Sequence, residues 1–280
     1  MTTAPLDALR QAAIAREPDR YFAATLAPEA LRYDFIALAA FAAELANIPT
    51  QVREPLAGEI RLQWWRDALA ANGDQVAAGN PVAVAMRDAI ARHGLPAEII
   101  DSVIDSYADV LHGERPANEQ ALIDHLSAGE GGLFRLAARI SAGDETGELW
   151  PVTRAAGLAY GLSRALLRLP SEGAARLPIP RTLLSDADLT EAAGDIKNPA
   201  VSAAIGTLVA LSQDAMREIS PQLAKLSRVQ RLPFLPLAMV RPNLRALEAW
   251  LQRGAGATPI DPLSITRLLR MTWAHASGRF

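Results

Sequence analysis

Residues 31–47, LRYDFIALAAFAAELAN, constrain the fold more than any other part of this chain. Read as a helix, the segment is apolar on almost every side, and such a helix packs inside a bundle rather than on its surface. Glu44 and Asn47 are the polar groups near its C-terminal end, and Pro49 directly after Ile48 predicts that the helix ends there. Chemistry in the interior is therefore expected near Glu44 and Asn47.

The other strongly periodic segments are also helical, and no segment reads as a convincing β-strand. Residues 5–16 and 54–71 predict amphipathic helices on either side of the central one. The helix over 54–71 is expected to bury the apolar residues Leu56, Ile60, Trp64 and Leu69. The pattern predicts an all-α protein.

Composition excludes several classes of function. The formal net charge is -3 and no basic patch is interleaved with aromatic residues, so nucleic acid is not expected as a partner. The chain has no cysteine, which excludes disulfides and thiolate metal sites, and its four histidines form no HExxH motif. The N-terminus lacks the apolar run of a signal peptide and no segment reaches the roughly 20 apolar residues of a membrane span. We expect a soluble, cytoplasmic protein.

Two local patterns each permit a functional and a structural interpretation. Asp101, Asp105 and Asp109 recur every four residues, as in a metal site, but apolar residues occupy the opposite side of that helix. We therefore interpret them as a solvated acidic stripe. The glycines of residues 129–132 precede a helix without the spacing of a P-loop or dinucleotide motif, which favours close helix packing or a tight turn over phosphate binding.

Several segments together resemble the squalene/phytoene synthase family. They are Arg20-Tyr21-Phe22, Ala27-Pro28, Leu31-Arg32, FIALAAFAAELA at 35–46, EPLAGEIRLQWWRDAL at 54–69, GLAYGLSRALLRLP at 157–170 and RLPIP at 176–180. The resemblance covers about residues 18–250. It implies an isoprenoid-synthase-like helical bundle around a central cavity, formed by a single domain over 1–280. Residues 254–259 are glycine-rich and predict a linker to a C-terminal amphipathic helix.

The resemblance also implies a site, and the site departs from the family pattern. The family's enzymes condense two isoprenoid diphosphates head to head, and aspartate pairs on two facing helices hold Mg²⁺ against the diphosphates. Magnesium takes carboxylate and phosphate oxygens. At the matching positions this chain carries Ala46, Asn47 and Thr50 on the first helix, and Arg164, Arg168 and Glu172 on or after the second. The comparison predicts that both metal sites are lost, with no catalytic residue, no metal and no cofactor.

The sequence leaves the role of the arginines open. Arg164 or Arg168 would close the cavity by pairing with Glu44, because an isolated buried carboxylate is costly. In the alternative, both arginines reach solvent. If the chain is instead an active prenyl transferase, Arg53, Arg61, Arg164 and Arg168 would have to neutralise diphosphate in place of Mg²⁺.

Within the family, this chain resembles the branch that contains the mitochondrial complex I assembly factor. The resemblance lies in three short motifs: F-x-x-E-L-A at 41–46, NPVA at 80–83 and RHGL at 92–95. This resemblance implies a protein partner, namely subunits of respiratory complex I (NADH dehydrogenase). An apolar or isoprenoid ligand, held without turnover, is a third interpretation.

Residues 262–280 predict a basic amphipathic helix. Ile265, Leu268, Leu269 and Ala276 lie on one side and Arg267 and Arg270 on the other. We expect the apolar side to pack on the chain's own domain. The alternative is peripheral contact with the inner membrane.

Overall fold

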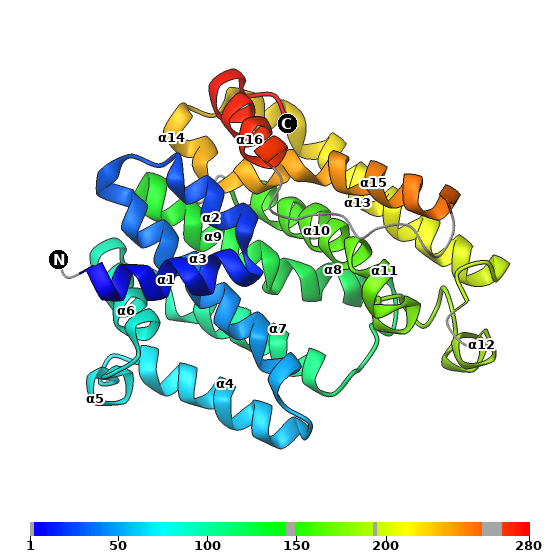
Figure 1. Cartoon of the computed structure of the whole chain (residues 1–280), viewed down its shortest axis with the longest axis horizontal. Helices are drawn as coiled ribbons and strands as arrows, with labels where there is room; N and C mark the ends of the chain where they lie inside the picture. The colour runs from blue at the N-terminus through cyan, green and yellow to red at the C-terminus, as the bar shows by residue number, and fades with distance from the viewer. Residues whose placement is uncertain (1–2, 144–148, 193–194, 254–264) are drawn as a thin grey trace.

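The computed structural model describes residues 3–143, 149–192, 195–253 and 265–280. Within them the chain forms helices and no strand, which confirms the predicted all-α class (Figure 1). The helices are α1 Thr3–Arg16, α2 Pro18–Thr25, α3 Glu29–Gln51, α4 Pro55–Leu69, α5 Asp74–Ala77, α6 Pro81–His93, α7 Ala97–Leu111, α8 Glu119–Ala128, α9 Glu130–Ala142, α10 Trp150–Leu167, α11 Leu169–Glu172, α12 Asp186–Glu191, α13 Pro199–Lys225, α14 Arg228–Arg231, α15 Val240–Arg253 and α16 Ile265–Ser277, with 3₁₀-helices η2 Ala174–Arg176 and η3 Leu232–Met239.

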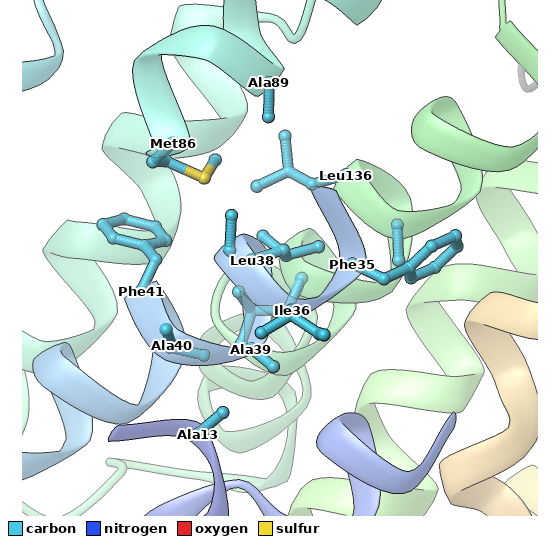
Figure 2. Packing of buried hydrophobic residues seen from close by; sticks show 14 of the residues in the cluster. Ala13, Phe35, Ile36, Leu38, Ala39, Ala40, Phe41, Met86, Ala89 and Leu136 are labelled. Carbon is cyan, nitrogen blue, oxygen red and sulfur yellow. The ribbon is translucent and has the colours of Figure 1, made fainter. Parts of the chain in front are cut away.

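Helix α3 lies inside the bundle, as its apolar composition predicts. Every residue from Phe35 to Ala43 is buried. Figure 2 shows side chains of other helices around it: Ala13 comes from α1, Met86 from α6 and Leu136 from α9. Three different helices thus cover the sides of α3, which explains why it carries no solvent-facing polar stripe over that stretch.

Two clusters of apolar side chains form the core, and α9 and η3 contribute to both. One cluster contains residues of α1 to α7, and the other contains residues of α8, α10, α13 and α15. Leu133 of α9 belongs to the first cluster and its neighbour Phe134 to the second. Phe134 stacks on Phe234 of η3 with ring centroids 5.9 Å apart. The opposite faces of α9 and η3 therefore join the two halves.

Glycines allow α9 and α10 to approach closely. A Cβ atom placed on Gly157 would lie 2.3 Å from the backbone nitrogen of Gly131, which is closer than any side chain tolerates. One turn further along α10, a Cβ on Gly161 would lie 2.8 Å from Cδ2 of Leu126. The interpretation of the glycines at 129–132 as a packing feature is confirmed for Gly131.

Helix α3 is longer than predicted. It continues through Pro49 to Gln51. A proline removes one backbone hydrogen bond and crowds the preceding turn, and the helix ends two residues after it. The hydroxyl of Thr50 also donates to the backbone carbonyl of Asn47 at 2.8 Å, which holds the last turn in place.

The buried face of α4 differs from the one predicted: Trp64 and Leu69 are partly buried against the core, but Leu56 and Ile60 are not. Leu56 and Ile60 are 66% and 64% exposed, whereas Leu62 and Trp65 are buried. The apolar residues of this helix lie on more than one side, so periodicity alone does not select a face. Two contacts select it: Trp65 packs edge-on against Phe41 of α3 at 5.2 Å, and Gly58 lies against Leu111 of α7.

Helix α16 packs on the rest of the chain, as expected, but its buried side is formed by Arg267, Met271 and Ala274 and not by the predicted apolar residues. Arg267 is 4% exposed, while Ile265 and Leu269 are 72% and 61% exposed. The buried carboxylate of Asp19 requires a cation, and Arg267 supplies it. The predicted linker at 254–259 lies outside the described residues. None of the described helices combines the length and apolar character needed to cross a bilayer.

Candidate functional site

The C-terminal end of α3 carries the first group of predicted site residues. The Thr50 hydroxyl accepts a hydrogen bond from Nη2 of Arg16 at 3.0 Å, and its one proton is shared between the backbone carbonyl of Asn47 at 2.8 Å and Oδ1 of the same residue at 3.1 Å. Glu44 is half-buried, and burial raises the pKa of its carboxyl group. Ala46 lies on the same turn and offers no ligand atom. A guanidinium, an amide and a hydroxyl therefore meet at the end of this helix.

The second group lies at the end of α10, and its members point to different places. Arg164 turns inward: its Nη1 lies 2.6 Å from Oε1 of Glu17, and its Nη2 donates to the backbone carbonyl of Arg16 at 3.0 Å. Arg168 is about half exposed and pairs with Glu172 at 3.4 Å.

The predicted pairing of Glu44 with Arg164 or Arg168 is therefore wrong. The turn between α1 and α2 places Glu17 against Arg164, so the arginine is neutralised by Glu17 and not by Glu44 of α3. Among the described residues, Glu44 has no ion-pair partner.

Four side chains from three parts of the sequence form what we call the interior charge cluster: Glu17, Arg20, Glu130 and Arg164. Arg20 reaches Glu17 at 2.9 Å and Glu130 at 2.7 Å, and Arg164 reaches Glu130 at 3.2 Å. Each guanidinium thus contacts both carboxylates. Glu17 is completely buried and Arg20 is 8% exposed.

Aromatic rings and opposite charges stabilise the charged forms of Arg20 and Glu130. The Arg20 guanidinium lies 5.2 Å from the ring centroid of Phe134 and 5.1 Å from that of Tyr160. Burial alone would lower the pKa of Arg20 and raise that of Glu130, but the opposite charges outweigh burial. The pKa of Arg20 is raised and that of Glu130 is lowered. These directions keep Arg20 and Glu130 charged at neutral pH.

A second buried ion pair adjoins the cluster. Arg267 of α16 binds Asp19 through two hydrogen bonds, from Nε at 3.0 Å and from Nη2 at 2.9 Å. The hydroxyl of Tyr160 donates to the same carboxylate at 3.1 Å, and burial together with Asp19 raises the pKa of that hydroxyl. Tyr160 therefore touches both groups of charges.

The interior beside these charges is nearly full. A cavity between α2, α3, α9 and η3, with Arg20 on its wall, has a volume of about 20 Å³. That is room for about one water molecule, whereas small-molecule sites usually enclose about 300–1,000 Å³.

The donor atoms at these positions do not match those that magnesium selects. Mg²⁺ is bound in proteins through carboxylates and substrate phosphates. The end of α3 instead offers Asn47 and Thr50 beside the Arg16 guanidinium. Over residues 3–143, 149–192, 195–253 and 265–280, no three His, Asp or Glu side chains are grouped so that they could hold a metal ion.

The remaining sequence-derived candidates lie at the surface. Arg53 and Arg61 are exposed, and Arg61 donates to Oε1 of Gln51 at 2.5 Å. The aspartates at 101, 105 and 109 are exposed, which confirms the solvated stripe. These residues do not reach the interior charge cluster.

Sequence reasoning missed Glu17, Glu130, Asp19 and Arg267. Glu17 precedes a proline and Glu130 stands among glycines, so both read as parts of turns. One signal was available: Arg164 interrupts the apolar run LAYGLSRALL, and a cation inside such a helix requires a buried carboxylate. Its identity depends on the tertiary structure.

Comparisons with known proteins agree with this fold. The crystal structure of the squalene synthase HpnC from Alicyclobacillus acidocaldarius matches 88% of this chain and 94% of its own, with a TM-score of 0.71 and 17% identity. A Bos taurus protein named "NADH dehydrogenase (ubiquinone) complex I, assembly factor 6" is 29% identical over 129 residues. That match covers 45% of this chain and 38% of the bovine protein. The family model of squalene/phytoene synthase matches residues 15–257. The chain therefore belongs to the squalene/phytoene synthase family.

Proposed function

We propose that this chain is a non-catalytic member of its family that acts as an assembly or chaperone factor for respiratory complex I. The observation that carries the non-catalytic part is the interior charge cluster. Arg164, on the helix that carries the second aspartate pair in the family's enzymes, is bound to Glu17 and Glu130. The positive charge of Arg164 is therefore neutralised by carboxylates of the protein itself.

The chemistry of the family reaction supports this proposal. A departing diphosphate carries several negative charges, which Mg²⁺ stabilises in the enzymes. Here Ala46, Asn47 and Thr50 replace the first carboxylates, and Arg168 stands where a carboxylate of the second pair is expected. A diphosphate near Arg164 would have to break ion pairs that are already satisfied. The cavity beside Arg20, at about 20 Å³, would also have to open.

The assembly part rests on the bovine relative, whose name states a role in complex I assembly. Subunits of complex I are the proposed partners, with the chain in the cytoplasm or peripheral at the inner membrane. The exposed apolar side chains of Leu56 and Ile60, one turn apart on α4, offer a contact of the kind that protein partners cover. Their 66% and 64% exposure sets them apart from the buried face of that helix.

Calorimetric titration of the full chain with farnesyl diphosphate, with and without Mg²⁺, tests the non-catalytic part. We expect no Mg²⁺-dependent binding and no release of pyrophosphate. Tight Mg²⁺-dependent binding with formation of a condensed product would replace this proposal with an active prenyl transferase. Binding that is indifferent to Mg²⁺, without turnover, would instead indicate a non-catalytic isoprenoid-binding protein.

Removal of the gene from its host tests the assembly part. We expect less assembled complex I on native gels and a lower NADH dehydrogenase activity of membranes. The wild-type chain and the variant Arg168→Gln should both restore assembly, because Arg168 is exposed and its pair with Glu172 contributes little. The variant Ile60→Glu should restore less. Unchanged complex I after removal of the gene would contradict the assembly role.

A further inference from the structure

A surface pocket lies between the start of α3, the short helix α14 and the end of α16. Its volume is about 310 Å³. Leu26, Pro28, Val229 and Leu232 form its apolar wall, and Arg228 and His275 are its polar members. It shares no lining residue with the interior charge cluster.

The pocket has cationic groups without counter-ions. Within the part of the chain that the structure describes, no carboxylate lies within 4.0 Å of Arg228 or of the neighbouring Arg231. Arg231 has a partial structural role, since its Nη1 donates to the backbone carbonyl of His275 at 3.4 Å. Arg228 has no such role and is exposed beside the pocket.

Two buried nitrogen atoms at this place lack hydrogen-bond partners. Among the described residues they are Nδ1 of His275, which lines the pocket, and Nε of Arg231, which does not line it but lies beside His275. Buried polar atoms are nearly always satisfied, and each exception calls for an explanation. Burial and the two arginines also lower the pKa of His275, so the positive charges nearby act on the imidazole without compensation.

The start of α3 adds to the positive character of the pocket. Pro28 precedes the first residue of this 23-residue helix, and no side chain caps its first turn. Free backbone N–H groups and the helix dipole make such a terminus attractive to anions. Glu29 in that turn is exposed and its charge reduces the effect in part.

We propose that this pocket binds the phosphate group of an amphiphile, with Arg228 and His275 at the phosphate and Leu26, Val229 and Leu232 along the carbon skeleton. Inorganic phosphate would suit the cations but would leave the apolar wall uncovered. An apolar molecule alone would leave Arg228 without a counter-ion and His275 without a polar partner. The combination of both surfaces in one pocket favours a molecule that carries both. The inference does not depend on the proposed assembly role.

The test is a set of calorimetric titrations of the full chain with three probes. They are inorganic phosphate, dihexanoyl phosphatidic acid as a soluble amphiphile, and phosphatidylcholine vesicles with and without phosphatidic acid. We expect the soluble amphiphile to bind more tightly than inorganic phosphate. Vesicle binding that requires phosphatidic acid would identify a lipid headgroup as the source, and binding of the soluble amphiphile without vesicle binding would identify a free phosphate ester.

Substitutions locate the site. Arg228→Gln should weaken binding of the soluble amphiphile roughly tenfold to a hundredfold, since hydrogen bonds to charged groups are among the stronger ones. His275→Gln should also weaken it. Arg245→Gln removes the same charge from an exposed position on α15 and should leave affinity unchanged. In NMR spectra, ring resonances of His275 should shift on binding while those of exposed His112 stay fixed.

Three results would overturn the proposal. The first is no binding of any probe to the wild-type chain. The second is equal affinity for inorganic phosphate and the soluble amphiphile, because the apolar wall would then have no role. The third is unchanged affinity in both Arg228→Gln and His275→Gln while the chain remains folded by thermal unfolding.

Discussion

Arg164 shows how a single side chain shapes the interior of this protein. It lies on a helix whose buried residues carry no charge, and it contacts Glu17, Glu130 and the backbone of Arg16. A buried ion pair contributes little compared with apolar packing, but removal of one partner leaves an uncompensated buried charge. The cluster therefore acts as a unit.

Replacing Arg164 by methionine should be strongly destabilising. The substitution leaves Arg20 alone to neutralise two carboxylates, one of which is completely buried. We expect a loss of about 3–5 kcal/mol in the free energy of unfolding, measured by urea titration. Arg168→Met is the matched control, because its pair with Glu172 is about half exposed, and should cost at most about 1 kcal/mol. Equal losses of unfolding free energy in the two variants would show that Arg164 does not form the buried ion pairs with Glu17 and Glu130.

Glu130 should make stability dependent on pH. Its pKa in the folded protein is lowered from 4.5, because Arg20 and Arg164 outweigh the effect of burial. As pH falls, Glu130 therefore takes up its proton in the unfolded chain before it does so in the folded protein. Its contribution to the free energy of unfolding is complete above the ordinary pKa of 4.5 and is lost below it, as pH approaches the lowered pKa.

The variant Glu130→Gln tests this dependence. Urea titrations at several pH values should show the variant less stable than the wild type at pH 7, with the difference shrinking below about pH 4.5. Glu172→Gln removes an exposed carboxylate and should stay within about 0.5 kcal/mol of the wild type throughout. A constant difference between Glu130→Gln and the wild type at every pH would contradict the assignment.

At the scale of elements, the contact between α9 and α10 depends on the absence of side chains. Gly157→Ala should push the two helices apart, since the added Cβ would lie 2.3 Å from a backbone nitrogen of α9. We expect a loss of at least about 1–3 kcal/mol. Gly206→Ala on α13 has nothing within 4 Å of its Cβ and should stabilise by about 0.5–1 kcal/mol. Thermal unfolding of both variants measures the contrast, and a stabilised Gly157→Ala variant would refute the close packing.

At the scale of the whole molecule, the ion pair between Asp19 and Arg267 joins segments near the two ends of the sequence. The residues are 248 positions apart, and α16 lies against α2 and η3 (Figure 1). The inward residues of α16 are Arg267, Met271 and Ala274, so its attachment depends on this buried pair and on those two apolar side chains.

Arg267→Met should loosen α16 while the rest of the bundle stays folded. Hydrogen exchange of the α16 amides should accelerate about a hundredfold or more, as expected for loss of roughly 3 kcal/mol from a broken buried pair. Arg270→Met is the control, because Arg270 lies on the same helix but is exposed, and its exchange should match the wild type. Exchange that rises equally in both variants would show that the Asp19 contact does not hold the helix.

Much of the fold is readable from local sequence. The apolar segment around Phe41 predicts a central helix, Asn80 and Gly94 mark the two ends of α6, and the acidic residues of α7 predict a solvated side. These features are local, since they depend on residues one to four positions apart. The helix over 54–71 was also predicted, but its buried side was not, because apolar residues occupy more than one side of it.

The sequence by itself determined that the chain is helical, that α3 is buried, and that the positions of the family's aspartates carry Ala46, Asn47, Thr50 and Arg168. Only the tertiary structure decided what neutralises the buried charges. Glu17, Arg20, Glu130 and Arg164 are up to 147 positions apart and meet because α1, α2, α9 and α10 pack together. The periodicity of side chains shows which side of a helix is apolar, but it does not show which distant residue will neutralise a buried charge. The ion pair between Asp19 and Arg267 buries a side of α16 that its apolar pattern did not predict, because the buried carboxylate requires a cation.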